Sequence, residues 1–199
     1  MYVLATQIVL GLIWTSLPRY SFAAQPPNTS GQTGLVNMPN AYIEDDGVWR
    51  MGFSRLAPYS VLWSSITALP RVELSARFTS IDDVAGFASG NYGDYKDKAF
   101  DAKVQLFDES DYAPALARGY MDALGTRLFA AEYAALSKTI GVAELTVGVG
   151  TKRIKGVFGG ARVKLSPSSP WAFVVERDVT RYDQDIGAAS SGASGRLNK

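Results

Sequence analysis

Alternating apolar and polar side chains dominate the chain from about residue 48 onward. In the clearest stretch, residues 71–79, the apolar side chains share one parity and every charged side chain takes the other. Successive side chains of a β-strand point to opposite faces, whereas a helix would scatter these charges around its circumference. The pattern therefore predicts a strand with one apolar face and one charged face.

The same alternation predicts further strands along the chain. They cover residues 48–55, 61–69, 99–107, 144–150, 157–165 and 171–177. Runs rich in Gly, Pro, Asn and Ser separate them, at 57–60, 90–94 and 166–170, and such residues favour turns. Strands of this length joined by turns predict an all-β protein, an antiparallel meander of about 8–10 strands.

Two Ala-rich stretches, residues 111–124 and 126–138, leave strand and helix both open. Leu128, Glu132 and Leu136 would share one face of a helix, and the local propensity slightly favours an amphipathic helical pair. The surrounding strands favour two more strands instead. We predict strands, with the helical pair as the alternative.

The first residues predict export. Residues 3–17 are mostly apolar, Pro18 interrupts them, and small side chains follow at Ser21 and Ala23. A run of about fifteen apolar residues is too short to span a bilayer comfortably, which favours a signal peptide over residues 1–23. The n-region lacks Lys and Arg, so a short uncleaved anchor or a buried helix is the alternative.

Residues 24–47 predict a leader and irregular entry segment before the strands. Positions 25–34 are polar and rich in turn-forming residues, which indicates a flexible leader, and Pro39 blocks a regular element after them. Residues 48–199 would then form the β-barrel portion.

Composition excludes several classes of function. The chain has 20 basic and 19 acidic residues, a net charge of +1, which gives no electrostatic footprint for nucleic acid. It contains no Cys and no His, so it lacks disulfides, a thiolate nucleophile, a lipid anchor on an N-terminal cysteine and the commonest general base. The carboxylates at 82–83 and 108–111 lack the spacing of a calcium loop or a glycosidase pair. We expect no catalytic, cofactor or metal site.

Alternation does not by itself say which face meets the surrounding solvent. A lipocalin-like soluble barrel turns its apolar face inward, whereas an outer-membrane barrel turns it outward to lipid. The polar face carries both signs of charge at adjacent positions, as a hydrated lumen would, and this favours the membrane version. The residues predicted to line the lumen are Arg71, Glu73, Arg77, Asp101, Lys103, Arg162 and Lys164.

Aromatic residues near the expected strand ends favour the same orientation. Rings at headgroup level form belts in membrane proteins. The candidates are Trp49, Tyr59, Trp63, Tyr92, Tyr95, Phe107 and Trp171. The alternative for each ring is an ordinary place in a protein core.

Several sequence blocks resemble a known family. They are GLVNMPNA at 34–41, WRMGFS at 49–54, LPRVELSARFT at 69–79, YKDKAFDAK at 95–103, GYMDALGTRLFAAEY at 119–133 and FGG at 158–160. Together they resemble the YjbH-like family of outer-membrane β-barrel proteins linked to exopolysaccharide and capsule production. The resemblance implies a non-catalytic protein of the Gram-negative outer membrane that contacts lipid, polysaccharide and other proteins of the export pathway.

Members of that family are several times longer than this chain, so the resemblance implies an N-terminal portion of a larger barrel. The last residues, 196–199, lack the terminal aromatic residue that outer-membrane barrels commonly carry. The main alternative is a soluble periplasmic β-protein that binds a carbohydrate or a protein partner. A carboxylate-dependent polysaccharide hydrolase is disfavoured because the acidic residues are scattered.

Overall fold

One antiparallel sheet makes up the fold. The computed structural model describes residues 25–86 and 93–185, so the signal peptide predicted at 1–23 lies outside the described residues. Nine strands pair in sequence order, which confirms the predicted all-β meander. They are β1 (Trp49–Leu56), β2 (Tyr59–Leu69), β3 (Val72–Ala85), β4 (Asp94–Phe107), β5 (Ala115–Gly125), β6 (Ala131–Ile140), β7 (Ala143–Lys152), β8 (Gly156–Lys164) and β9 (Ala172–Arg177). Within the described residues β1 and β9 are free edges, so the sheet is not closed into a barrel.

The two Ala-rich stretches are strands, as the context predicted, and not a helical pair. They form β5 and β6, which pair with Gly119 opposite Tyr133. A side chain at Gly119 would collide with the Tyr133 ring, so glycine is required for the ring to lie across the neighbouring strand. The alanines on the same face are small enough for other residues to pack directly over the sheet.

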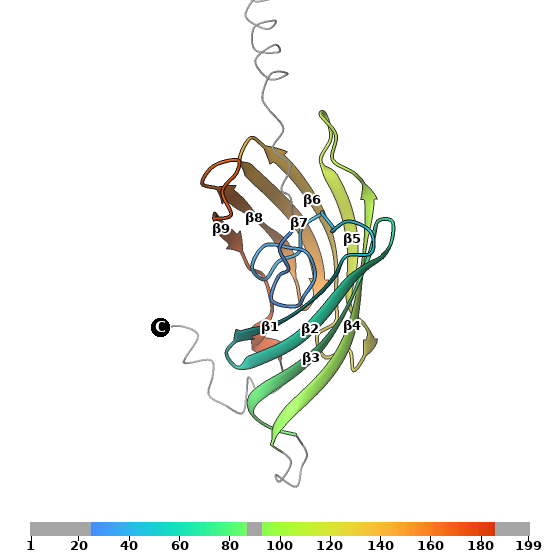
Figure 1. Ribbon diagram of the computed structural model, residues 1–199. Helices are drawn as coiled ribbons and strands as arrows, with labels where there is room; N and C mark the ends of the chain where they lie inside the picture. The colour runs from blue at the N-terminus through green and yellow to red at the C-terminus, as the bar shows by residue number, and fades with distance from the viewer. Residues whose placement is uncertain (1–24, 87–92, 186–199) are drawn as a thin grey trace, which may run out of the picture.

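The sheet curls, and residues 25–47, here called the inner segment, lie inside the curl (Figure 1, blue). Its polar side chains Gln32, Thr33 and Asn40 are fully buried. The prediction of a flexible leader is therefore wrong, while the irregular backbone is as expected. The physical reason is that the sheet supplies distant partners for its polar groups; for example, the backbone N–H of Ala41 donates to Ser137 Oγ at 2.9 Å.

The two faces of the sheet differ in the side chains that they carry. Every strand presents large apolar side chains on the outer face; in β7, Leu145, Val147 and Val149 are 44%, 52% and 52% exposed. The inner face carries buried polar and charged side chains, such as Glu144. Large apolar side chains that adjoin one another on an exposed face mark an interaction surface.

The aromatic residues split between the two faces. Trp49, Phe107 and Trp171 are exposed, as an interfacial position requires, but Tyr59 and Trp63 are buried. The prediction for these last two is wrong because they share the inward parity of β2, where Trp63 packs over the inner segment at Gly31. Tyr95 is half-buried, and Tyr92 falls outside the described residues.

Helices contribute almost nothing to the described part of the chain, which contains one short 3₁₀ turn, Tyr182–Gln184. No helix in residues 25–86 or 93–185 is long and apolar enough to cross a membrane.

Candidate functional site

Four charged residues lie together on the inner face of β3 and β4. Glu73 and Lys103 are directly opposite each other in the register, and Asp101 stands opposite Ser75, next to Arg77. Their side chains are almost completely buried, with Lys103 at 0% and Arg77 at 7% exposed. Opposite charges on neighbouring strands stabilise each other. Because these charges are buried, leaving one of them without its partner would strongly destabilise the fold.

The inner segment completes this cluster through one residue, Thr33. Its backbone N–H donates to Glu73 Oε1 at 2.8 Å, and its hydroxyl donates to the other carboxylate oxygen. Lys103 Nζ donates to the Thr33 carbonyl at 2.9 Å and to its hydroxyl oxygen at 2.7 Å. Thr33 therefore connects the buried Glu73 carboxylate to the buried Lys103 ammonium. It lies 40 residues from Glu73 and 70 residues from Lys103 along the chain, so these contacts could not be predicted from the sequence pattern.

A second buried ion pair lies on β7 and β8. Arg162 Nη2 donates to Glu144 Oε2 at 2.6 Å, and the two residues are opposite each other in the register. Asn40 of the inner segment donates to the other Glu144 oxygen at 3.1 Å. The inner segment is thus bonded to charged groups on both sides of the curl.

Two predicted lumen residues lie outside these two clusters. Arg71 occupies the turn between β2 and β3 with a φ of 67°, and its half-exposed side chain pairs with Asp108. The prediction for Arg71 fails because the strand begins one residue later, so the alternation does not extend to it. Lys164 ends β8, where it pairs with Ala172 of β9 and is half-buried.

Glu176 of β9 holds the inner segment and was not singled out in the sequence. Its carboxylate accepts hydrogen bonds from the backbone N–H groups of Val36, Asn37 and Met38 at 3.0, 2.9 and 3.1 Å. Several backbone donors converging on one carboxylate form a strong, charge-assisted contact. In the sequence, this role is indicated only by the position of Glu176, whose parity in β9 directs its side chain to the inner face.

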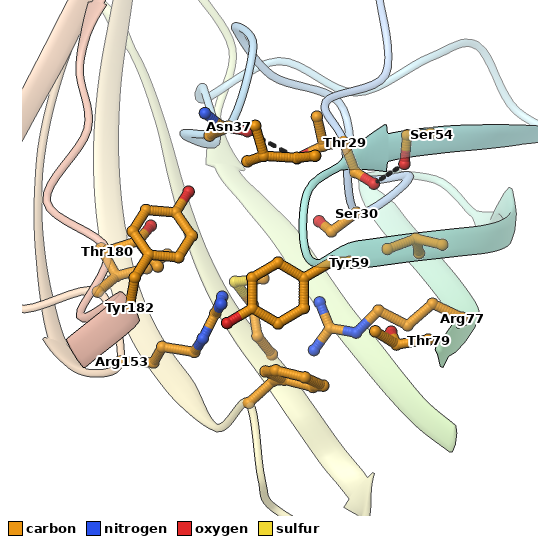
Figure 2. A pocket seen from close by; sticks show the side chains of 15 residues that line it. Thr29, Ser30, Asn37, Ser54, Tyr59, Arg77, Thr79, Arg153, Thr180 and Tyr182 are labelled. Atoms are coloured by element: carbon orange, nitrogen blue, oxygen red, sulfur yellow. Dashed lines mark hydrogen bonds between the residues drawn. The ribbon is translucent and has the colours of Figure 1, made fainter. Parts of the chain in front are cut away.

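A cavity of about 70 Å³ lies between the inner segment, β3 and the segment that follows β9 (Figure 2). Three aromatic rings, from Tyr59, Phe129 and Tyr182, surround two arginines, Arg77 and Arg153. Figure 2 shows the two guanidinium groups on either side of Tyr59. Of these five residues, sequence reasoning assigned only Arg77 to the interior.

Arg153 is fully paired. Its Nε and Nη2 donate to Asp185 at 2.9 and 2.6 Å, and its guanidinium lies 4.7 Å from the centre of the Phe129 ring. Burial alone would lower the pKa of Arg153, but the hydrogen bonds and the charge of Asp185 outweigh it and raise that pKa. Tyr59 donates its hydroxyl to the same carboxylate, so Asp185 connects the segment after β9 to β2.

Arg77 is less well paired. Its Nη2 lies 3.4 Å from Asp101 Oδ1, yet neither Nε nor Nη2 has a hydrogen-bond partner among the described residues. Asp101 itself accepts a backbone hydrogen bond from Asp122 at 2.6 Å. A buried guanidinium with two unsatisfied donors is uncommon, since such groups usually find a partner, an ordered water or an ion.

The surface carboxylates form ion pairs and do not gather into a metal site. Asp82 pairs with Arg55 at 2.6 Å, and Glu109 pairs with Lys138 at 3.2 Å. In the part of the chain that the structure describes, no group of three or more acidic residues could hold a metal ion.

Comparison with known proteins identifies the family. A family model described as "Exopolysaccharide biosynthesis protein YbjH" matches residues 27–169. A protein of Escherichia coli (strain K12) named "Uncharacterized lipoprotein YjbH" is 34% identical over 125 residues, which are 60% of this chain and 18% of that protein. The chain thus spans less than a fifth of that relative, and no solved structure matches it. The matched region covers most of the sheet, and the chain belongs to the YjbH exopolysaccharide biosynthesis family.

Proposed function

We propose that this chain forms part of an outer-membrane β-barrel that takes part in exopolysaccharide export or assembly without catalysing a reaction. Membership of the family supports the link to exopolysaccharide. The distribution of side chains carries the membrane part of the proposal, because charged residues are buried on the inner face while large apolar residues lie on the outer face of every strand, beside a few charged ones such as Arg118 and Glu132. Lipid is the solvent that this arrangement suits.

Strand length supports the same proposal. A membrane-spanning β-strand needs about 9–11 residues when tilted. The strands β2 to β8 have between 9 and 14 residues, and only the edge strands β1 and β9 are shorter. Further strands pairing with β1 and β9 would close the sheet and remove both exposed edges.

In this proposal the inner face is the wall of a lumen. Its residues Glu73, Arg77, Asp101, Lys103 and Arg162 would contact the inner segment, polysaccharide or other proteins of the pathway. The inner segment occupies the concave side, so what passes or docks there must pass beside it or displace it.

A soluble periplasmic protein that binds carbohydrate is the second candidate. The cavity beside Arg77, with its three aromatic rings, favours it, since aromatic and polar groups together suit a sugar. This candidate requires a partner protein to cover the apolar outer face.

The test places a charge on the outer face. Phe100 is 54% exposed near the middle of β4, and Phe100→Arg should oppose insertion by about 2–4 kcal/mol. Leu69→Arg, at the end of β2, is the matched control and should cost only about 0–1 kcal/mol near the interface. The readouts are heat-modifiable gel migration and recovery with outer membranes.

Recovery of the unchanged protein in the soluble periplasmic fraction would overturn the membrane assignment. Equal behaviour of Phe100→Arg and Leu69→Arg in membranes would argue that the outer face of β4 does not contact lipid.

A further inference from the structure

The two guanidinium groups beside the cavity at Tyr59 differ in how many of their hydrogen-bond donors are used. Arg153 is satisfied by two hydrogen bonds to Asp185. Arg77, 7% exposed, has only an ion contact of 3.4 Å with Asp101 and two donors without a hydrogen-bond partner among the described residues. A ligand in this cavity would therefore be recognised mainly by Arg77.

The charges around the cavity disfavour a ligand that carries more than one negative charge. Arg77 and Arg153 face Asp101 and Asp185, so the four groups together are already neutral when all are ionised. A phosphate group brings a charge of about −1.5 to −2, which this balance does not favour. A carboxylate brings one charge, and its two oxygens match the planar fork of a guanidinium.

The size and the walls of the cavity indicate what carries the carboxylate. About 70 Å³ is well below the roughly 300 Å³ of the smallest common ligand pockets, so it admits a substituent and not a whole ligand. The Tyr59 and Phe129 rings pack edge to face with their centroids 6.0 Å apart, and the centroids of the Tyr59 and Tyr182 rings are 6.2 Å apart. Aromatic rings with polar edges suit the alternating apolar and hydroxyl-bearing surfaces of a sugar.

We propose that this cavity is a subsite for the carboxylate of an acidic sugar residue in a polysaccharide. Arg77 binds the carboxylate, and the Tyr59 and Tyr182 rings lie beside the sugar. The carboxylate assignment comes from the cavity alone, while the polysaccharide rests on the proposed function. Asp101 and Asp185 hold the two guanidinium groups in place.

The experiment measures binding by calorimetry with the full chain folded in detergent micelles. The probes are a short galacturonic acid oligomer, its methyl ester and inorganic phosphate. The acid oligomer should bind, and the ester and phosphate should bind at least about tenfold more weakly, because one lacks the charge and the other carries too much of it. Equal binding of acid and ester, or tighter binding of phosphate, would overturn the proposal.

Variants assign the binding to Arg77. Arg77→Gln should weaken it by about ten- to a hundredfold, the effect of losing a charge-assisted hydrogen bond. Arg118→Gln is the matched control, since Arg118 also lies over a tyrosine ring, at 5.1 Å from Tyr120, but is exposed outside the cavity. If Arg77→Gln fails to fold, Arg77→Lys keeps the charge opposite Asp101 while removing the planar fork, and should still bind at least severalfold more weakly.

The two proposals fail in different ways. Loss of acid-selective binding in a protein that still enters outer membranes would refute the subsite and leave the membrane role intact. Acid-selective, Arg77-dependent binding by a soluble protein would refute the membrane role and support the subsite. Unchanged binding in a folded Arg77→Gln or Arg77→Lys variant would refute the role of Arg77.

Discussion

The two halves of the inner face differ in the side chains that dominate them. On β3 and β4 it consists of buried charges and hydroxyl groups, Glu73, Arg77, Asp101 and Lys103 among them. On β5 to β8 alanines and a few large rings surround the Glu144–Arg162 ion pair, and Tyr133 and Phe158 meet edge to face there at 6.4 Å. The inner segment contacts both halves, with Thr33 on the charged side and with Leu35, Met38 and Ala41 on the apolar side.

The two halves therefore act on the inner segment in different ways. Apolar contacts stabilise its position, and contacts with charged groups fix its orientation. Burial of apolar surface contributes stability roughly in proportion to area, whatever the detailed geometry. Buried charges lose their hydration, and their pairing roughly offsets that loss without adding much. We therefore expect the apolar half to provide most of the stability, and the charged half to be costly only when one partner is removed.

The largest effect is expected at Phe158, in the apolar half. Phe158 is 1% exposed and packs against Tyr133, so Phe158→Ala should lower the free energy of unfolding by about 3–5 kcal/mol. Denaturant titration in detergent micelles measures it. Phe107→Ala is the control, because that ring is 64% exposed and its loss leaves no internal cavity. Similar losses in both variants would contradict the assignment of Phe158 to the stabilising half.

A double-mutant cycle at Glu73 and Lys103 tests the charged half, with a smaller expected effect. Lys103→Met leaves Glu73 with Thr33 and a 3.5 Å contact to Arg50, and should cost about 2–3 kcal/mol. Glu73→Gln, which leaves the ammonium without its opposite charge, should cost about as much.

The double variant decides between the two interpretations. Removing both charges together should cost about 1–2 kcal/mol less than the sum of the single changes, since neither charge is then left buried alone. Denaturant titration of all four proteins gives the coupling. Strict additivity would show that the two residues act independently and that the charged half is not a paired unit.

The same contrast explains which strands could be predicted from the sequence. In residues 72–79 of β3 and 99–107 of β4 the charges fall on one parity because the inner face there is charged and the outer face apolar, so the alternation is visible in the sequence. On β5 and β6 the inner face is alanine and the outer face also includes apolar residues such as Leu124 and Leu136, so the alternation fades. For β5 and β6 the neighbouring strands were therefore a better guide than the local helix propensity.

The inner segment and the cavity could not be predicted because their contacts are distant in sequence. The bond between Val36 and Glu176 spans 140 residues, and that between Tyr59 and Asp185 spans 126. Polar, turn-rich residues such as those at 25–34 have the composition of a flexible leader, and only a curled sheet with matching partners buries them. Arg153 and Asp185 lie in loops, where no periodicity indicates which way a side chain points.

The smallest expected effect is at Tyr42, a polar contact at the border of the apolar half. Its ring packs against the apolar cluster, and its hydroxyl donates to Glu109 and lies 3.1 Å from Thr139 Oγ1. Tyr42→Phe should cost about 1 kcal/mol near neutral pH, the usual worth of one such hydrogen bond. Tyr112→Phe is the control, because Tyr112 is 92% exposed and should change nothing measurable.

The pH dependence sharpens this last test. Burial first, and then the hydrogen bond to Glu109, raise the pKa of Tyr42 above its ordinary value. A tyrosine in the unfolded chain ionises near pH 10, before the folded one does, so ionisation favours unfolding. The stabilisation from Tyr42 is therefore complete below about pH 10 and is lost as the pH rises above it. Denaturant titrations at alkaline pH should show the unchanged protein losing stability more steeply than Tyr42→Phe, and parallel curves would mean that the hydroxyl is not buried against the apolar half.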